Sequence, residues 1–308
     1  MNVLDQHLVE AVAERLRADP GLIEKDWHVT RALEVLAAFD HGGAAPAFGG
    51  GTSLSKGWSL IKRFSEDIDF KVAMPARVSR SQEKKARSVY RERVLGGLTA
   101  AGFVVGADVL KRDESSFFSA ALFYPALFDT GPGLRPHIRI EMSLAPPALP
   151  PIGRPIASMI GVAQGSPPEI AAFPCVDPVE TAADKLSALA WRVLARRRGS
   201  DTDDPTIVRH VHDLAALKPH VATSGHFRSL ARKAMADDAG RGGEATASAD
   251  PATLFTAMLD RLATDPLWGS EYQDYVDAVS FAPPDELLGF DKALAAVRDL
   301  VALIGESA

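Results

Sequence analysis

Two aspartates that alternate with apolar residues, just downstream of a glycine run, constrain the fold of this chain more than any other feature. The glycine run lies at 49–51 and the alternating segment "DIDFKV" at 67–72. Because successive side chains of a β-strand point to opposite faces, Asp67 and Asp69 share one face and the apolar residues share the other. The apolar face has to be buried, so the segment predicts a strand in a sheet that is covered on one side. The two like charges on the open side call for a compensating partner.

The glycine run stands between the end of a strand and a helix expected over 52–64. Small residues at Gly50 and Gly51 let backbone N–H groups approach a phosphate, whose negative charge the start of a helix favours. Thr52 and Ser53 would add hydroxyl donors, with Thr52 also expected as the N-cap of the helix. The alternative is an ordinary tight turn. The run matches neither a P-loop nor a dinucleotide-binding fingerprint.

The paired carboxylates suit a hard divalent cation such as Mg²⁺. On its own, the alternative for Asp67 and Asp69 is a solvated strand face. The segment "HIRIEMSL" at 137–144 predicts a neighbouring strand, on which Glu141 is the leading candidate for a third ligand or general base, unless it is a plain surface glutamate. Glu66 is expected on the opposite face, as a bystander. A glycine turn, a helix and then an Asp-x-Asp strand would suit two-metal nucleotidyl transfer.

Three further residues are candidates for the same site. Lys185 lies two turns into a helix capped by Asp177, where its charge would bind a β- or γ-phosphate or simply face solvent. Asp213 is spaced as an i,i+4 partner of Arg209, and the alternative is a surface ion pair without function. Ser65 is either a turn residue that satisfies backbone groups or a phosphate contact.

Composition limits the partners. The 308 residues carry a net charge of −6, so nucleic acid would be bound only through local basic patches. The candidates are Arg196–Arg198, Lys84–Lys85 and Lys111–Arg112, each of which is otherwise a solvated charged face. A single cysteine, Cys175, precludes an internal disulfide and fits a reducing cytoplasm. The sequence lacks a bilayer-length apolar run and the pattern of a signal peptide, so we expect a cytoplasmic protein without a membrane partner.

The order of elements predicts an α+β protein with a mixed sheet and flanking helices, followed by a C-terminal helical domain. Residues 1–45 are expected to form helices that pack on the core. Residues 46–150 mix strands and helices and form the core itself. Residues 151–175, rich in proline and glycine, are expected to be a connection with a short hairpin inside. Residues 176–308 are predicted to be helical.

The chain resembles the AbiEii/AbiGii family of nucleotidyltransferase toxins, within the DNA polymerase β-like nucleotidyltransferase superfamily. The resemblance spans about residues 20–220 and is most specific at 49–70. It rests on the segments "EKDWHVTRALEVL", "FGGGTSLSKGWSLIKRFSEDIDF", "DPVETAADKLSALAWRVL" and "RHVHDLAAL". It implies a polymerase-β-like nucleotidyltransferase core.

The resemblance also implies roles for individual residues. It matches Gly50, Gly51 and Ser53 to the nucleotide-cradling turn. It matches Asp67 and Asp69 to the metal-binding Asp-x-Asp, Lys185 to the helical lysine of the family, Asp213 to its late aspartate, and Ser65 to a serine implicated in regulation by phosphorylation in some members. Glu141 would be the third acid, where many superfamily members have an aspartate.

The function implied is that of a toxin in a bacterial toxin–antitoxin or abortive-infection system. Such a toxin would transfer NMP from an NTP co-substrate to RNA, in several members the tRNA 3′ end, with two Mg²⁺ ions, and so block translation. An AbiEi-like antitoxin would be its partner. One alternative is a nucleotidyltransferase for a protein or small-molecule hydroxyl, and another is a non-catalytic NTP-binding protein. An RNA acceptor predicts a basic surface that leads to the site, and a cationic small molecule predicts an enclosed acidic pocket.

Overall fold

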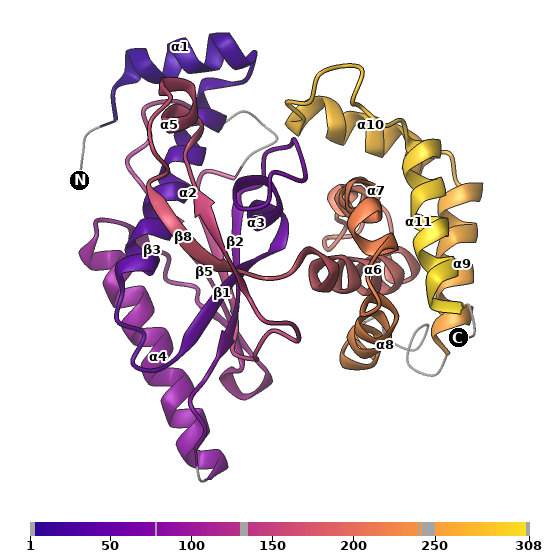
Figure 1. The fold of residues 1–308 in the computed structure, drawn as a ribbon, viewed down its shortest axis with the longest axis horizontal. Coiled ribbons are helices and arrows are strands. Elements are labelled where there is room, and N and C mark those ends of the chain that lie inside the picture. Colours follow the sequence, from indigo (N-terminus) through magenta and orange to yellow (C-terminus); the bar gives the residue numbers. More distant parts are fainter. Residues whose placement is uncertain (1–3, 78, 130–134, 240, 242–249, 306–308) are drawn as a thin grey trace. The chain divides into compact units, whose positions relative to one another are not determined.

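The chain divides into two compact units, Met1–Asp177 and Pro178–Ala308, each described here by itself. The computed structural model describes residues 4–77, 79–129, 135–239, 241 and 250–305 (Figure 1). No helix among these residues combines the length and the apolar character that crossing a bilayer requires.

Unit 1 is built on one mixed sheet. Within its described residues, eight strands pair in the order β3-β5-β6-β2-β1-β8-β7, with β4 beside β5. The pairs β2–β6 and β1–β8 are parallel, and the remaining pairs are antiparallel. The strands are β1 (Ala45–Gly49), β2 (Asp67–Ala73), β3 (Val104–Val105), β4 (Leu110–Arg112), β5 (Phe117–Phe123), β6 (Ile138–Ser143), β7 (Ile152–Ile156) and β8 (Ile170–Cys175).

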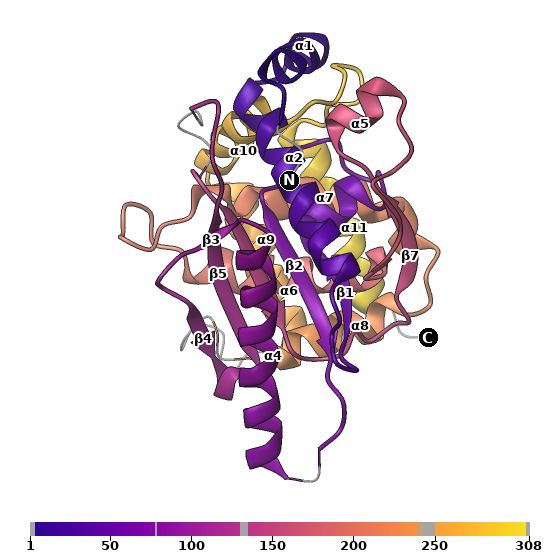
Figure 2. The same cartoon turned by 90° about the vertical axis from the view of Figure 1, so that its left-hand side faces the viewer.

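Two long helices cover one face of this sheet (Figure 2). Leu33 of α2 and Val94 of α4 pack in the same core as Ile68, Phe70 and Met142 of the central strands. This leaves the polar side of the central strands on the other face. The helical elements of unit 1 are α1 (Gln6–Leu16), α2 (Pro20–Ala38), α3 (Gly50–Lys56), α4 (Arg80–Ala100), α5 (Met159–Gln164) and the 3-10 helix η1 (Asp113–Ser115).

Two local expectations need correction. The helix after the glycine run begins at Gly50, with Gly49 as its N-cap instead of Thr52, and ends at Lys56 instead of residue 64. The proline- and glycine-rich segment 151–175 does contain an antiparallel pair, β7 and β8, as expected, but the pair encloses α5 and belongs to the main sheet, so the segment is part of the core and not a mere connection. The β8 strand extends the sheet beside β1, so its backbone hydrogen bonds are made within the fold.

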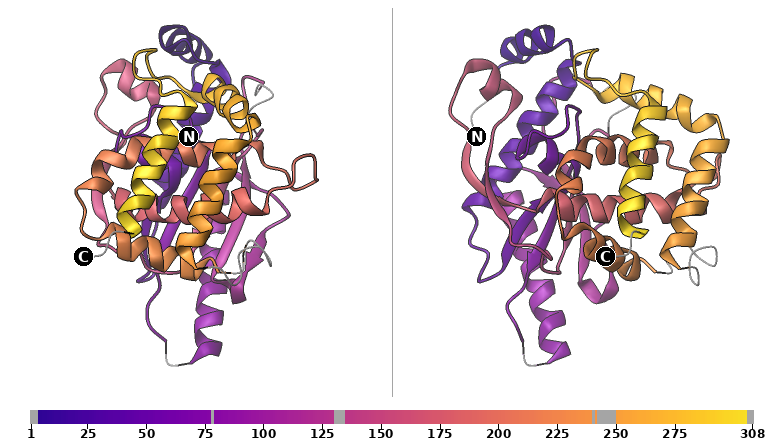
Figure 3. Two further views of the ribbon diagram at one scale, coloured as in Figure 1. Left: turned by 90° about the vertical axis from the view of Figure 1, so that its right-hand side faces the viewer. Right: turned by 45° about the vertical axis from the view of Figure 1, so that its right-hand side comes forward.

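Unit 2 is helical where described, as predicted (Figure 3). The α6 helix packs against α7, α8 and α9, and α11 packs against α7, α8 and α9. Asp204 and Asp250 cap the starts of η2 and α9 through their side chains, and a proline follows each cap. The elements are α6 (Pro178–Ala195), the 3-10 helix η2 (Pro205–Val208), α7 (Arg209–Ala222), α8 (Phe227–Asp237), α9 (Pro251–Thr264), α10 (Leu267–Val279) and α11 (Phe290–Gly305).

Candidate active site

The β2 strand separates its acidic and apolar residues as the alternation predicts. Ile68, Phe70 and Val72 are buried in the core beneath α2 and α4. Asp67 and Asp69 lie on the other face and are partly exposed. The desolvation cost of holding two carboxylates on one strand is reduced there, because each of the two side chains keeps contact with water and with neighbouring polar groups.

The sheet register brings Glu141 to the same row as Asp69. The parallel β2–β6 pairing sets Asp69 opposite Glu141 and Asp67 opposite Arg139. The row continues to Gly49 on β1 and to Ser119 on β5. Residues directly opposite each other in neighbouring strands lie about 5 Å apart. A glycine turn, an aspartate and a glutamate that are far apart in sequence are therefore neighbours on one face.

The carboxylate of Asp69 lies directly against the glycine turn. Gly50 has φ +68°, and a Cβ built on it would lie 1.8 Å from Asp69 Oδ2. Only glycine fits here, because a side chain would both strain the backbone and displace the carboxylate. A Cβ on Gly51 would lie 2.7 Å from Arg63 Nη2 and 2.9 Å from Ser65 Oγ. Ser65 therefore packs against the turn.

The two hydroxyl residues after the turn face inward. Thr52 is 1% exposed and donates its hydroxyl hydrogen bond to the main-chain oxygen of Asp67. Ser53 is equally buried, beside the thiol of Cys175. Burial raises the pKa of this thiol to about 11, against a smaller lowering by Ser53. The Thr52 hydroxyl thus braces the turn from within, and both residues are shielded from solvent.

Sequence reasoning missed Arg135, which holds one of the two aspartates. Its Nη1 lies 2.7 Å from Asp67 Oδ1, and its Nε lies 3.5 Å from Glu66 Oε1. Glu66 is not a bystander, because its Oε2 also accepts from the Arg135 backbone N–H at 3.1 Å and from Lys25 Nζ at 2.5 Å. No periodicity marks Arg135 in the sequence. Arg135 reaches Asp67 because its loop leads into β6, the strand that pairs with β2.

The helix α2 ties the surrounding loops together, which accounts for its unusual buried charges. Glu24 accepts hydrogen bonds from the backbone N–H groups of Leu127 and Phe128 at 2.7 and 3.1 Å. Asp26 pairs with Lys56 of α3 at 2.6 Å. The segment "EKDWH" thus anchors the helix of the glycine turn as well as the loops beside the sheet.

The acids of the site have the chemistry of a divalent metal site without yet being gathered around one point. Carboxylate oxygens are the ligands that Mg²⁺ prefers. Burial raises the pKa of Glu141, and the nearby charge of Asp67 raises it further, against smaller lowering by Arg139 and Arg135. The part of the chain that the structure describes contains no group of three or more His, Cys, Asp or Glu side chains already arranged to hold a metal ion. The donors fit the ion, and enclosing it requires side-chain movement.

Unit 2 contains the second pair of predicted residues. Lys185 Nζ on α6 lies 2.8 Å from Asp213 Oδ2 on α7, and both side chains are buried. His212 Nδ1 lies 3.2 Å from Asp213 Oδ1. His210, which sequence reasoning did not single out, is buried close by, and burial lowers its pKa well below the usual value. The lysine charge is thus held by a carboxylate in a largely dry environment.

The predicted pairing of Asp213 with Arg209 is wrong. Arg209 instead binds Asp204 Oδ2 at 3.1 Å, together with the hydroxyl of Thr206. Asp204 is the N-cap of η2, so this ion pair stabilises the turn that precedes α7. Asp213 points to Lys185, one helix away.

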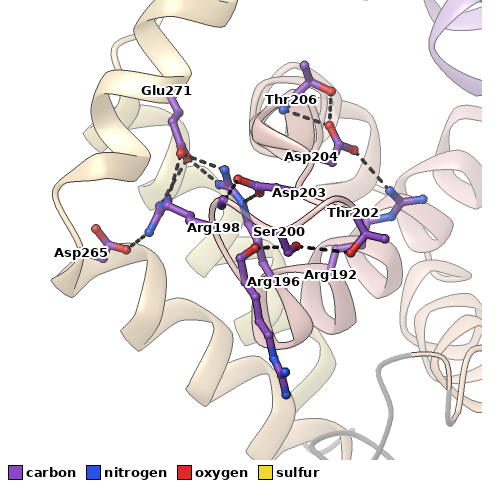
Figure 4. A network of polar contacts seen from close by, with 12 residues as sticks. Arg192, Arg196, Arg198, Ser200, Thr202, Asp203, Asp204, Thr206, Asp265 and Glu271 are labelled. Carbon is purple, nitrogen blue, oxygen red and sulfur yellow. Dashed lines mark hydrogen bonds and ion pairs between the residues drawn. The ribbon is translucent and has the colours of Figure 1, made fainter.

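Two arginines of the run 196–198, Arg196 and Arg198, take part in a network of ion pairs within unit 2, whereas Arg197 is exposed (Figure 4). Arg196 binds Asp203 at 2.6 Å and Glu271 at 2.6 and 2.8 Å, and is 7% exposed as a residue. Arg198 binds Glu271 and Asp265. Both guanidinium carbons lie within 4.7 Å of the centre of the Trp268 ring. The charges of Arg196 and Arg198 are therefore neutralised internally. Lys84, Lys85, Lys111 and Arg112 are exposed.

Comparison with known proteins agrees with this architecture. The sequence model of the nucleotidyl transferase AbiEii toxin of type IV toxin–antitoxin systems matches residues 31–297. Among solved structures, the nucleotidyltransferase toxin MenT4 from Mycobacterium tuberculosis H37Rv is similar, with 20% identity and a TM-score of 0.54, over 99% of this chain and 91% of that chain. That likeness confirms the predicted α+β fold. No curated protein matches the chain. From the family match over most of its length, the chain belongs to the AbiEii family of nucleotidyltransferase toxins of type IV toxin–antitoxin systems.

Proposed function

We propose that this toxin transfers a nucleoside monophosphate from an NTP to RNA, at the 3′ end of tRNA, and thereby blocks translation. The observation that carries the proposal is the position of Asp69. Its carboxylate lies against Gly50 of the glycine turn, and its strand register sets it directly opposite a second acid, Glu141. Nucleotidyl transfer needs such a juxtaposition, because metal-binding oxygens and a phosphate-binding backbone have to act on the same triphosphate.

In this proposal each residue has one task. Asp67, Asp69 and Glu141 hold two Mg²⁺ ions, which when bound supply the positive charge that lowers the pKa of the acceptor hydroxyl and screens the triphosphate. Gly50 and Gly51 stand at the start of α3, where their backbone N–H groups would bind the phosphates. Thr52 holds this turn in shape from inside through its hydrogen bond to Asp67, and Ser53 is buried beside it. Ser65 packs on the outside of the turn, where we propose that it contacts the nucleotide or is modified.

Lys185 and Asp213 have linked tasks. We propose that Lys185 binds the β- or γ-phosphate and that Asp213 holds its ammonium in place while no nucleotide is bound. The ion pair at 2.8 Å supports this, because it fixes the position of the ammonium. A bound triphosphate carries more negative charge than the Asp213 carboxylate, so it would attract the ammonium more strongly.

An RNA acceptor is favoured by basic and aromatic residues on the same sheet face, two positions along the strands from the acids. Lys71 on β2 lies opposite Ser143 on β6, which lies opposite Phe117 on β5. Arg112 on β4 pairs with Phe117, and its guanidinium carbon lies 5.9 Å from the centre of the ring. Cationic groups beside an aromatic ring suit a single-stranded end, whose bases stack while its phosphates meet the charges. A cationic small molecule would call for acids in this row instead.

The toxin role implies an antitoxin partner. We propose an AbiEi-like protein encoded beside the toxin, and action in the cytoplasm, where the translating tRNA pool is found. A neighbouring reading frame of that type would support this part of the proposal, and co-purification of the two products would test it.

The deciding experiment is a transfer assay. Purified protein is incubated with Mg²⁺, each labelled NTP in turn and total tRNA, beside the Asp69→Ala and Asp67→Ala variants. We expect label on one RNA size class, reduced roughly 100-fold or more in both variants because stabilisation of transition-state charge is lost. Asp108→Ala removes an exposed carboxylate of unit 1 and is the matched control, with unchanged transfer.

The outcomes separate the competing functions. Transfer and growth inhibition that survive Asp69→Ala would refute the proposed site. Label on a protein or a small molecule would keep the chemistry and change the acceptor. Tight NTP binding with no label on any acceptor would indicate a binding protein without catalysis.

A further inference from the structure

The main chain of Arg135 is clamped by two buried or half-buried charges. Its N–H donates to Glu66 Oε2 at 3.1 Å, and its carbonyl accepts from Lys25 Nζ at 2.6 Å. Lys25 is 3% exposed and comes from α2, which is packed into the core of unit 1. The position of the Arg135 backbone is therefore set by the folded core, although the residue lies in a connection between strands.

The side chain of Arg135 is held less firmly than its backbone. It is 38% exposed, and its hydrogen bond to another side chain is the one from Nη1 to Asp67 Oδ1 at 2.7 Å. The contact of its Nε with Glu66 Oε1, at 3.5 Å, is longer. An arginine side chain has several rotatable bonds and stays charged at every physiological pH. It can leave Asp67 by rotation, without movement of the main chain.

Asp67 is one of the carboxylates to which the proposed function assigns the metal. A guanidinium and a divalent cation are both attracted to the same carboxylate oxygens, and they repel each other at contact distance. Arg135 therefore stabilises the acids without a metal and opposes the metal's arrival. Arg139 is different, because its Nη1 lies 3.9 Å from Glu141 Oε1, beyond hydrogen-bonding distance.

We propose that Arg135 is a tethered counter-ion: it neutralises Asp67 before a divalent metal binds, and it has to release this carboxylate for the metal to enter. The proposal rests on the metal role assigned to Asp67 and Asp69 above. It makes Arg135 a positioning residue whose charge lowers the affinity of the site for metal. Removing that charge then tightens metal binding, whereas the loss of an ordinary structural contact would leave it unchanged or weaken it.

The test measures metal binding to the full chain without nucleotide or RNA. Mn²⁺ is titrated into the purified protein, and free Mn²⁺ is followed by electron paramagnetic resonance. We expect Arg135→Gln to bind Mn²⁺ about tenfold more tightly than the wild type, because one close positive charge is gone. Arg135→Lys keeps the charge and should stay within about twofold of the wild type. Arg135→Ala is a second uncharged variant, and thermal unfolding verifies that each protein is folded.

Arg139→Gln is the matched control, because it removes a positive charge from the same sheet face without removing a hydrogen bond to Asp67. Its effect should be clearly smaller than that of Arg135→Gln. If Arg135→Gln and Arg135→Ala bind no more tightly than the wild type, or no more tightly than Arg139→Gln, the counter-ion proposal is overturned.

Asp69→Asn separates this proposal from the proposed function. Weaker Mn²⁺ binding in Asp69→Asn together with unchanged binding in Arg135→Gln would overturn the counter-ion role and leave the metal site standing. Unchanged Mn²⁺ binding in Asp69→Asn would overturn the metal site and the counter-ion role together.

Discussion

Arginines meet carboxylates in both units, yet the two contacts differ in how completely they are satisfied. In unit 2, the Arg196 side chain is 3% exposed and binds Asp203 and both oxygens of Glu271. In unit 1, the Arg135 side chain is 38% exposed and binds Asp67 through one hydrogen bond. A saturated, buried contact has no capacity for a ligand. A partly exposed contact that uses one oxygen leaves the carboxylate able to change partner.

The glutamates near these arginines show the same difference. Burial disfavours the charge of Glu271, but the hydrogen bonds from Arg196 and Arg198 outweigh it and lower the pKa of Glu271. Burial and the neighbouring Asp67 raise the pKa of Glu141. Enough positive charge has been placed around Glu271 to hold it ionised. At Glu141 the charges of Arg139 and Arg135 are too weak to outweigh burial and Asp67, and a metal ion at the proposed site would add positive charge there.

The largest effect on stability is expected for Arg196→Met. It would leave Glu271 and Asp203 without their principal partner in a mostly buried place, which should cost about 3–5 kcal/mol of unfolding free energy. Urea unfolding measures the loss. Arg197→Met, at an exposed position of the same run, should change the free energy by less than about 0.5 kcal/mol. If both variants lose an equally small amount of unfolding free energy, the arginine network of unit 2 does not stabilise the fold.

The stability difference between wild type and Arg196→Met should depend on pH. The pKa of Asp203 is lowered by its hydrogen bond from Arg196, and that of Glu271 is lowered in the folded state as well. A lowered folded pKa means that the stabilisation is complete above the usual value of 4.5 for glutamate and disappears as the pH falls below it. Urea unfolding of both proteins from pH 7 to pH 3 should show a difference in unfolding free energy that is constant above pH 5 and becomes smaller below pH 4.5. A difference that widens in acid would contradict this assignment.

A much smaller effect on stability than that of Arg196→Met is expected for Arg135→Gln. Its side chain is partly exposed, and ion pairs of that kind contribute about 1 kcal/mol or less. Urea unfolding of this variant should therefore stay close to the wild type, although its metal affinity changes. A loss comparable to that of Arg196→Met would place Arg135 among the structural arginines and remove the contrast between the two units.

Part of the fold and site could be predicted because the signals are local. Alternation along β2 depends on the strand geometry of seven residues, so the common face of Asp67 and Asp69 followed directly. The helical character of unit 2 followed from local periodicity and from Asp-Pro starts. The pairing of Arg209 with Asp213 was the local inference that failed, because Asp204, the cap of a preceding turn, competes for the same guanidinium.

By itself, the sequence determined the family, the strands β2 and β6 that carry the acids, the helical character of unit 2, and the residue types available for chemistry. Only the tertiary structure decided which of them are neighbours. The register between β2 and β6 sets Glu141 beside Asp69, and the position of α2 turns Lys25 and Glu66 into the clamp of Arg135. These contacts join residues between 41 and 110 positions apart. Local spacing carries no information about them, because register and loop position result from packing of the whole sheet.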